Sequence, residues 1–565
     1  MFLSSCARMH ESSSKKNEKI YNYAVLSQRM RKEVLENYIV DVAVVGGGIA
    51  ALRSAIAARK KGRDVLLISK GKAGKSGCSL ISEGILNGTF GEDDSPELFY
   101  KDIMKGSGDV ADPDLVKVLA ENARDAVLSL EGIGVSYVRE DGKLSLDLSG
   151  GNSVARTVRI DPPGPGCGKV IPKKLYEQAR AEGVAFLEGY SVVKVFTKDG
   201  AVNAALAYNG ESFVYIQCPS LVLATGGGGK LYTQTTNPNG ITGDGYYLAH
   251  DAGASLVDME YVQFFPTVAL RSYLVLPFIF TDGATMVNSE NERFLERYDP
   301  DLKEKTTRDR MSRAIFTEAM EGRGHEGGVY ISYADIPEKL RGTKYKKEVD
   351  FFKSKGIDVA KEKLHVRPAC HFFMGGVKID EKCATDVAGL YACGECAGGV
   401  HGANRLAGNA LAEALVFGEI AGKSAADHSM GASFVSADVD AYIASLPDET
   451  GGTKESEHLE ELRELAWTSL GIIRSEKPLE ETLGTLRALS EDYRGVESVG
   501  SLKHYFELRN AIHVLRTIAG AAHARTESRG AHYREDHPQT RPEWKKALIV
   551  KSDLSLVTDP RQVTG

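Results

Sequence analysis

The clearest hydrophobic pattern lies near the N-terminus, where two short apolar runs flank an alanine-rich segment. Residues 41–45 (DVAVV) and 64–69 (DVLLIS) are rich in β-branched side chains, which predicts buried strands. Residues 49–61 between them are rich in alanine and contain no proline, which predicts a helix. This order of strand, helix and strand indicates an α/β unit of the Rossmann-like kind.

Later segments extend the same pattern over most of the chain. Residues 219–224 and 389–393 are two more apolar runs that lead into glycines. Residues from about 246 to 365 mix short strands and helices and carry little nucleotide chemistry, so we expect a separate cap domain there. After a polar linker, Leu459, Leu462, Ala466 and Ile473 follow helical spacing, which predicts a helical C-terminal domain.

Composition narrows the class of protein. The chain has 565 residues, of which 42% are hydrophobic and 26% charged, as in an ordinary multidomain globular protein. A net charge of −7 argues against a nucleic-acid partner, which would favour a basic chain. Eight cysteines are too few for a disulfide framework, so a reduced, cytoplasmic setting is expected.

Membrane contact is expected only through a partner. The longest apolar run, residues 273–280, is far too short to span a bilayer. Residues 1–6 faintly resemble a lipoprotein signal but lack its apolar core. Residues 1–36 are polar, which predicts a disordered or peripheral arm, and whether translation starts at Met1 or Met30 is left open.

A glycine-rich turn after the first strand predicts a dinucleotide site. Gly46 permits the tight turn, Gly48 lets the backbone approach a pyrophosphate, and the small Ala51 allows close packing of helix on strand. The helix N-terminus that follows favours phosphate charge. The second strand ends in Ser69 and Lys70, where many such folds place an acidic residue on the ribose, so that contact is expected to be weaker.

Further glycine-rich segments favour FAD over NAD. Thr225 and Gly226 follow a buried strand, and Asp244 comes soon after. Glu395 follows a third strand and suits a ribityl hydroxyl. An extended flavin nucleotide needs such contacts spread along the chain, whereas NAD seldom does. The predicted FAD-binding residues are Gly46, Gly48, Ile49, Ala50, Ser69, Lys70, Ser76, Gly77, Gly84, Thr225, Gly226, Asp244, Glu395, Asn409 and Leu411.

Five segments together resemble the flavoprotein subunit of the succinate dehydrogenase and fumarate reductase family. They occur in family order between about residues 38 and 545. L-aspartate oxidase and thiol-driven fumarate reductases share this framework. The segments are 258–263 (DMEYVQ), 321–324 (EGRG), 369–376 (ACHFFMGG), 401–409 (HGANRLAGN) and 526–532 (TESRGAH).

The resemblance implies a reaction and roles for particular residues. The family exchanges a hydride between flavin N5 and a carbon beside a carboxylate, and moves a proton at the neighbouring carbon. By resemblance Arg323 is the proton donor, reloaded by Asp282, while His371 and Arg405 clamp one carboxylate of a small substrate. Such charge-assisted bonds also polarise the double bond. No metal ion is expected in the site.

Departures from the family pattern bear on the substrate. Phe265 stands where the family usually has a substrate-binding histidine. Beside Thr281, Asp282 replaces the usual glutamate, and Thr285 stands where a relay arginine is common. The site therefore has Phe265, Thr281, His371 and Arg405 as expected substrate contacts. A substrate less polar than fumarate at one end is an alternative.

Gly77 and the cysteines bear on the cofactors. Gly77 stands where many family members carry a histidine linked covalently to FAD, so non-covalent FAD is expected. Cys393 and Cys396 form one pair inside a turn assigned to the flavin, and no second pair has cluster spacing. An iron–sulfur centre would then belong to a partner subunit.

The leading hypothesis is the catalytic flavoprotein subunit of a fumarate-reductase-like enzyme. The alternatives are an L-aspartate oxidase and a non-catalytic assembly protein. The expected fold is α/β, a discontinuous Rossmann-like FAD-binding domain with an inserted α+β capping domain and a helical C-terminal domain. The expected boundaries are an arm at 1–36, FAD-binding parts at 37–245 and 367–447, a cap at 246–366, helices at 455–545 and a tail at 546–565.

Overall fold

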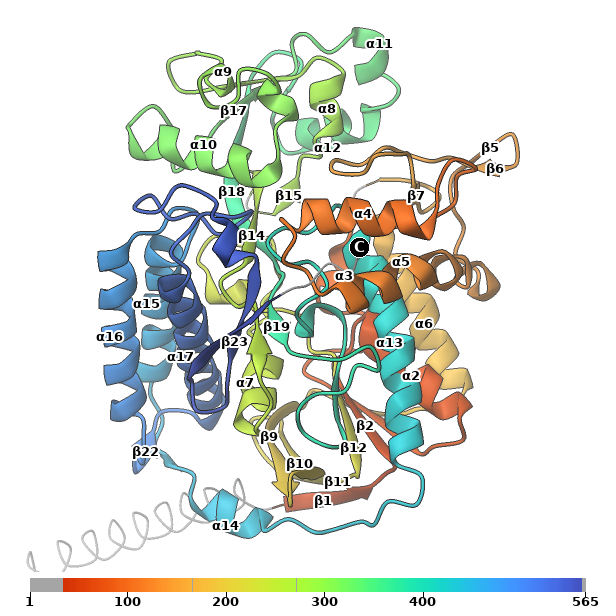
Figure 1. Cartoon of the computed structure of the whole chain (residues 1–565), viewed down its shortest axis with the longest axis vertical. Helices are drawn as coiled ribbons and strands as arrows, with labels where there is room; N and C mark the ends of the chain where they lie inside the picture. The colour runs from red at the N-terminus through yellow and green to blue at the C-terminus, as the bar shows by residue number, and fades with distance from the viewer. Residues whose placement is uncertain (1–33, 165, 271, 561–565) are drawn as a thin grey trace, which may run out of the picture.

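The computed structural model describes residues 34–164, 166–270 and 272–560. Figure 1 shows a central α/β region, a smaller cap above it, and a group of helices along one side. The expected fold class is confirmed, with the cap inserted into the α/β domain. Most of the arm predicted at 1–36 lies outside the described residues.

The central sheet is parallel and has the strand order β20-β12-β2-β3-β8. Every residue of β20, β12, β2 and β3 is buried, as expected for a parallel sheet covered on both faces. Strands from distant parts of the sequence therefore end along one edge. The strands are β2 (Val42–Val45), β3 (Val65–Ser69), β8 (Ala185–Glu188), β12 (Ser220–Leu223) and β20 (Leu390–Ala392).

Two helices that cover this sheet are packed unusually closely. Helix α2 (Ile49–Lys60) lies beside α13 (Asn409–His428), as Figure 1 shows. A Cβ atom on Gly422 would lie 2.1 Å from the backbone oxygen of Ser54, and one on Gly418 would lie 2.8 Å from that of Ala50. Glycine at these positions lets the helix backbones approach, which fixes both helix N-termini at the same edge of the sheet.

Other elements complete the α/β domain. A second sheet has the order β1-β11-β10-β9, and its strand β1 begins at Val34, so the last residues assigned to the arm belong to the domain. Its strands are β1 (Val34–Ile39), β9 (Ser191–Lys198), β10 (Ala201–Tyr208) and β11 (Phe213–Gln217). The nearby elements are α3 (Cys78–Ile81), β4 (Ile85–Asn87), α4 (Pro96–Gly106), α5 (Pro113–Leu128), β7 (Thr157–Arg159) and α6 (Val170–Ala181).

The cap has an apolar core of its own around Ile315, Ile331 and Phe352. A five-stranded sheet of order β15-β14-β18-β17-β16 joins it to the α/β domain through two long strands. The strands are β14 (Val262–Ala269), β15 (Tyr273–Leu274), β16 (Thr285–Val287), β17 (Val329–Ser332) and β18 (Leu364–Phe373). The helices are α8 (Phe278–Thr281), α9 (Leu295–Tyr298), α10 (Arg308–Met320), α11 (Glu338–Arg341) and α12 (Lys346–Ser354).

The cap begins later than the sequence indicated. Helix α7 (Asp244–Asp251) packs in the main core, and β13 (Leu256–Val257) pairs with β19 (Gly376–Val377), so both belong with the α/β domain. The expected boundary at 246 lies inside α7. Composition did not reveal this boundary, because the residues after Asp244 are as apolar as those of the cap.

The C-terminal region is helical as expected, but its end is not a tail. Helices α15 (Lys454–Ser469), α16 (Glu476–Asp492) and α17 (Leu502–Ala524) pack together at one side (Figure 1). Residues assigned to a tail form β23 (Lys546–Val550) and β24 (Leu556–Pro560), which extend the sheet of β13. Among the described residues, no helix is both long and apolar enough to cross a bilayer.

Candidate active site

One cavity of about 1280 Å³ runs along the carboxyl edge of the parallel sheet and reaches the cap. Its volume exceeds the roughly 300–1,000 Å³ of a typical single-ligand pocket. The segments that follow β2, β3, β12 and β20 all line it, as expected for a doubly wound fold. The glycine-rich segments predicted separately from the sequence thus meet in one place.

The cavity fits an extended dinucleotide at its glycine-lined part. A Cβ atom on Gly46 would lie 2.1 Å from the backbone oxygen of Ala224, so only glycine allows this turn beside the sheet. Helices α2 and α13 both begin at the cavity with a glycine as N-cap, which has no side chain to cap the helix, and the Ile49 N–H at the start of α2 donates to Ser79. Two helix N-termini at one cavity provide a favourable field for a pyrophosphate.

Two acidic residues lie at the predicted nucleotide contacts. Lys70 and Asp244 form an ion pair of 2.5 Å at the cavity wall. Burial opposes ionisation of Asp244, but Lys70 and hydrogen bonds hold its pKa below the usual value. Burial raises the pKa of Glu395 to about 7, and its Oε1 accepts a hydrogen bond from the Phe373 N–H. Glu395 thus retains acceptor capacity for a ligand hydroxyl.

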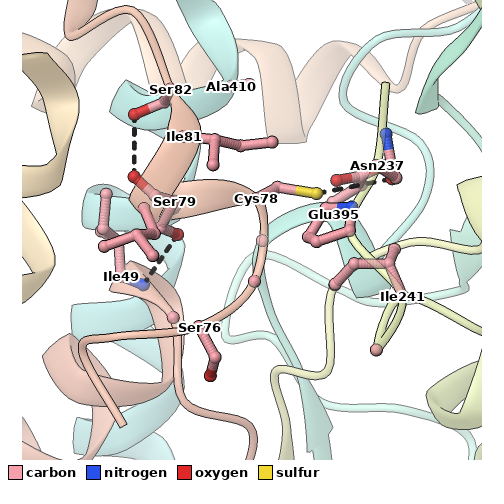
Figure 2. Close-up of a pocket in the computed structure, with 18 of the residues that line it drawn as sticks. Ile49, Ser76, Cys78, Ser79, Ile81, Ser82, Asn237, Ile241, Glu395 and Ala410 are labelled. Atoms are coloured by element: carbon pink, nitrogen blue, oxygen red, sulfur yellow. Dashed lines mark hydrogen bonds between the residues drawn. The ribbon is translucent and has the colours of Figure 1, made fainter. Parts of the chain in front are cut away.

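Gly77 lies on the loop that leads into α3. Its φ of +79° belongs to the left-handed region, which favours glycine. A Cβ atom there would be no closer than 3.9 Å to Ile241, so the space beside it is open. Figure 2 shows this loop, with Cys78 directed toward Asn237 and Ser79 hydrogen-bonded to the Ile49 N–H at 3.2 Å.

Thirteen of the fifteen residues predicted to bind FAD line the cavity, and Gly84 and Asn409 do not. A Cβ atom on Gly84 would lie 2.8 Å from Cys167 Sγ, so this glycine serves chain packing. Asn409 is fully buried and accepts a hydrogen bond from Asn87, which anchors the start of α13 beside the cavity.

The two residues of the predicted substrate clamp lie together at the cavity. His371, on β18, and Arg405 both line it. Arg405 donates from Nη2 to Gln263 at 2.9 Å and lies 4.3 Å over the Phe372 ring. Its Nε is buried and has no partner among the described residues. Such an unpaired buried donor indicates an anionic ligand.

Arg323, the expected proton donor, does not lie at the cavity. It follows the C-terminal end of α10 and forms ion pairs with Glu318, at 2.8 Å, and with Glu321. Hydrogen bonds from Arg323 to these carboxylates raise its pKa, which makes it a poorer acid. The glycines on either side of Arg323 suggested a ligand, but Gly322 serves a left-handed turn.

Arg308, at the other end of α10, lines the cavity and was missed in the sequence. Its guanidinium carbon lies 4.9 Å from the centre of the Phe265 ring, and it forms no hydrogen bond or ion pair with any described residue. Burial lowers the pKa of Arg308 to about 9, and the charge of Arg405 acts in the same direction. A cation without a counter-ion attracts an anion, and a lowered pKa makes its proton easier to release.

A sequence signal for Arg308 does exist. Helix α10 buries Met311, Ser312 and Ile315, which lie three, four and seven positions after Arg308. Arg308 therefore occupies the inward face of the helix, where an arginine needs a partner. Ser312 donates a hydrogen bond to the Phe264 backbone oxygen at 3.1 Å, which holds this face against β14.

Thr281 and Asp282 are also absent from the cavity. Asp282 accepts hydrogen bonds from Lys344, at 2.6 Å, and from Tyr345, which lower its pKa and keep it in the cap. Leu274 and Leu276, just before α8, line the cavity instead. The short helix α8 turns the following residues into the cap, which spacing in the sequence did not reveal.

His371 is uncharged at neutral pH. Burial lowers its pKa well below the ordinary value, and the charges of Arg405 and Arg308 add to this shift. Its Nδ1 lies 2.9 Å from the Thr236 hydroxyl, which orients the ring. The substrate part of the cavity thus combines a buried cation, Arg405, and a half-buried one, Arg308, with a neutral, oriented imidazole.

Comparisons with known proteins agree with this geometry. A family model described as an FAD binding domain matches residues 41–411, and one described as the fumarate reductase flavoprotein C-terminus matches residues 459–564. An uncharacterized FAD-dependent oxidoreductase of Methanocaldococcus jannaschii is 40% identical, with 90% of this chain and 96% of the relative covered. A chain of the fumarate reductase (CoM/CoB) of Methanothermobacter marburgensis is 37% identical, with 92% and 98% covered.

A solved structure agrees as well. A mutant chain of the E. coli quinol fumarate reductase superimposes with a TM-score of 0.86 at 27% identity, covering 94% of this chain and 98% of that one. Other relatives bear the names L-aspartate oxidase and succinate dehydrogenase flavoprotein subunit.

Proposed function

Because the chain belongs to the fumarate reductase and succinate dehydrogenase flavoprotein family and is an FAD-dependent oxidoreductase, we propose that it reduces the C=C bond of a small enoate. The observation that carries this proposal is the pair of cations, half-buried Arg308 and buried Arg405, beside the dinucleotide part of the cavity. FAD, when bound and reduced by an electron donor, would supply two electrons as a hydride equivalent.

In this proposal Arg405 and His371 hold the substrate carboxylate. Burial lowers the pKa of Arg405 only to about 10, so it remains cationic at neutral pH. The free Nε of Arg405 can donate to a carboxylate oxygen. Drawing charge onto that carboxylate makes the β carbon of the enoate more electrophilic.

Arg308 takes the role of proton donor in place of Arg323. The double bond gains a hydride equivalent at the β carbon and a proton from Arg308 at the α carbon, which gives the saturated acid. A donor pKa near 9 suits this step better than that of an ordinary arginine, because the proton is released more easily. Bulk water reaching the cavity can return the proton.

The direct test is an assay of the purified, FAD-loaded chain with a reduced dye and a panel of enoates. Formation of the saturated acid is expected. If no enoate is consumed and L-aspartate instead reduces the flavin, the chain is an oxidase, an activity favoured by its relatives named L-aspartate oxidase.

FAD is proposed to be non-covalent because Gly77 offers no side chain to bond it. Acid precipitation is then expected to release yellow flavin into the supernatant. Flavin fluorescence that stays with the denatured band on a gel would contradict this.

We also propose a partner subunit that carries an iron–sulfur centre and delivers electrons, because relatives are named as subunits of fumarate reductase and succinate dehydrogenase. Affinity purification from the native source, followed by iron and sulfide analysis, tests this. A chain that purifies alone and turns over with a soluble thiol or oxygen would overturn it.

A further inference from the structure

We propose that the substrate carries one carboxylate and, on its β carbon, a bulky apolar group such as a phenyl ring. This inference rests on the proposed enoate reduction and specifies its substrate class. The reduced flavin donates a hydride equivalent, which carries two electrons, to the β carbon, and a proton is added to the α carbon. The apolar group itself is not altered by the reaction.

Apolar side chains form the cap-side wall of the cavity, which begins beside the carboxylate clamp. Phe265 projects from β14, and its ring centre lies 5.2 Å from that of His371. Leu274 and Leu276 pack with Phe265 in one apolar cluster. Tyr273 and Phe351 continue the wall, with their rings stacked at 4.6 Å and an angle of 18°.

This wall provides no buried donor for a second carboxylate among the residues that the structure describes. The hydroxyl of Tyr273 is directed to Glu348 at 3.3 Å, so it is already in use. Arg308 lies over the face of Phe265, where it is the proposed proton donor, and the exposed Lys355 lies over the ring of Phe351. An anion placed against Leu276 and Phe265 would lose its hydration without regaining hydrogen bonds, whereas an aromatic ring would gain contact area.

Charged groups at the cavity agree with a single anionic end. Glu83 lines the cavity near Tyr273, and burial raises its pKa to about 7, with the charge of Glu348 adding to the shift. When ionised, Glu83 repels a second carboxylate. Lys169 and Lys355 also line the cavity but are exposed, so they attract anions to the opening without holding a buried one.

Binding of saturated acids to the reduced, FAD-loaded chain, where they have no electron acceptor, separates this inference from the proposed function. Phenylpropanoate and succinate are titrated into the FAD-loaded chain, and flavin absorbance changes and equilibrium dialysis report affinity. Phenylpropanoate is expected to bind at least about tenfold more tightly, as burial of an aromatic ring implies. Equal or tighter binding of succinate, or no binding of phenylpropanoate, overturns the inference.

Turnover then distinguishes the two possible failures. Cinnamate is expected to be reduced faster than crotonate, and crotonate faster than fumarate. If fumarate is the only enoate reduced, the inferred substrate class is wrong but the proposed enoate reduction stands. If phenylpropanoate binds tightly and no enoate is reduced, the proposed function is wrong and the apolar binding site is supported.

Two matched variants locate the preference. Phe265→His adds a donor and is expected to shift the affinity ratio toward succinate by roughly tenfold. Phe265→Leu keeps the wall apolar and is expected to preserve the ranking of ligands. Leu276→Thr, at a partly buried position, gives a second route to the same shift. Retained FAD content reports folding, and an unchanged ratio in both polar variants contradicts the inference.

Discussion

The two ends of helix α10 present arginines in opposite circumstances. Arg308, at the first position, lines the cavity without a counter-ion among the described residues. Arg323, just beyond the last turn, is held by Glu318 and Glu321. Burial lowers the pKa of Arg308, whereas hydrogen bonds to carboxylates raise that of Arg323.

The contrast shows that local sequence context is a poor guide to which arginine has a lowered pKa. The Glu-Gly-Arg-Gly segment around Arg323 suggested a ligand site because of its glycines. Arg323 is nevertheless neutralised by its ion pairs with Glu318 and Glu321. Arg308 looks ordinary in the sequence, yet it carries the uncompensated charge. A catalytic acid needs a destabilised proton, and of these two arginines Arg308 has one.

The largest effect is expected for Arg308→Ala. Loss of a general acid lowers turnover by roughly 10²–10⁴-fold, while FAD content and reduction of the flavin by dye persist. Arg308→Lys retains a cation and is expected to recover part of the rate. Steady-state kinetics with the best enoate measure both variants. Full activity in Arg308→Ala would show that Arg308 is no more important for turnover than Arg323.

Arg405→Ala is expected to act mainly on binding. Loss of charge-assisted hydrogen bonds, each worth about 1.5–3 kcal/mol, should raise KM by roughly 10–100-fold. Because Arg405 adds to the downward shift of the Arg308 pKa, its removal should also make Arg308 a weaker acid. A variant that loses FAD instead would show that Arg405 serves the cofactor.

The pH profile sharpens the same comparison. The donor must be protonated, so turnover is expected to persist below about pH 9 and to fall as pH rises through the pKa of Arg308. An ordinary arginine would show no such limb in this range. In Arg308→Lys the pH at which turnover falls should change. If turnover falls at the same pH as in the wild type, a group other than Arg308 causes the fall.

The smallest effect is expected for Arg323→Ala. Glu318 keeps Arg297 and Asn288 as partners, so turnover should change by less than about twofold. Arg297→Ala is a matched control, because it removes another arginine from the same carboxylate. Kinetics and thermal melting of both variants give the comparison, and a selective loss of turnover in Arg323→Ala would restore the role first expected for it.

The flavin part of the site could be predicted from the sequence because its signals are local. Gly46 and Gly48 follow a buried strand directly, and parallel strands bring Thr225 and Glu395 to the same edge. His371 and Arg405 belong to the longer segments 369–376 and 401–409, and both line the cavity.

The cap side could not be predicted in the same way. Which residues of 270–285 face the cavity depends on β15 and α8, two short elements with weak patterns. Leu276 rather than Thr281 therefore reaches the site. Arg323 was preferred to Arg308 because a glycine-flanked arginine is conspicuous in a sequence, whereas the inward position of Arg308 follows only from the helical phase of α10.

One measurement tests the central claim most directly, that Arg308 protonates an enoate reduced in this cavity. The FAD-loaded chain is reduced anaerobically and mixed with cinnamate in a single turnover, and flavin absorbance and the saturated acid are followed together. The account predicts one saturated acid per flavin reoxidised in the wild type and in Arg323→Ala, with the flavin of Arg308→Ala remaining reduced. Reoxidation of Arg308→Ala at the wild-type rate, with failure of Arg323→Ala, would contradict it.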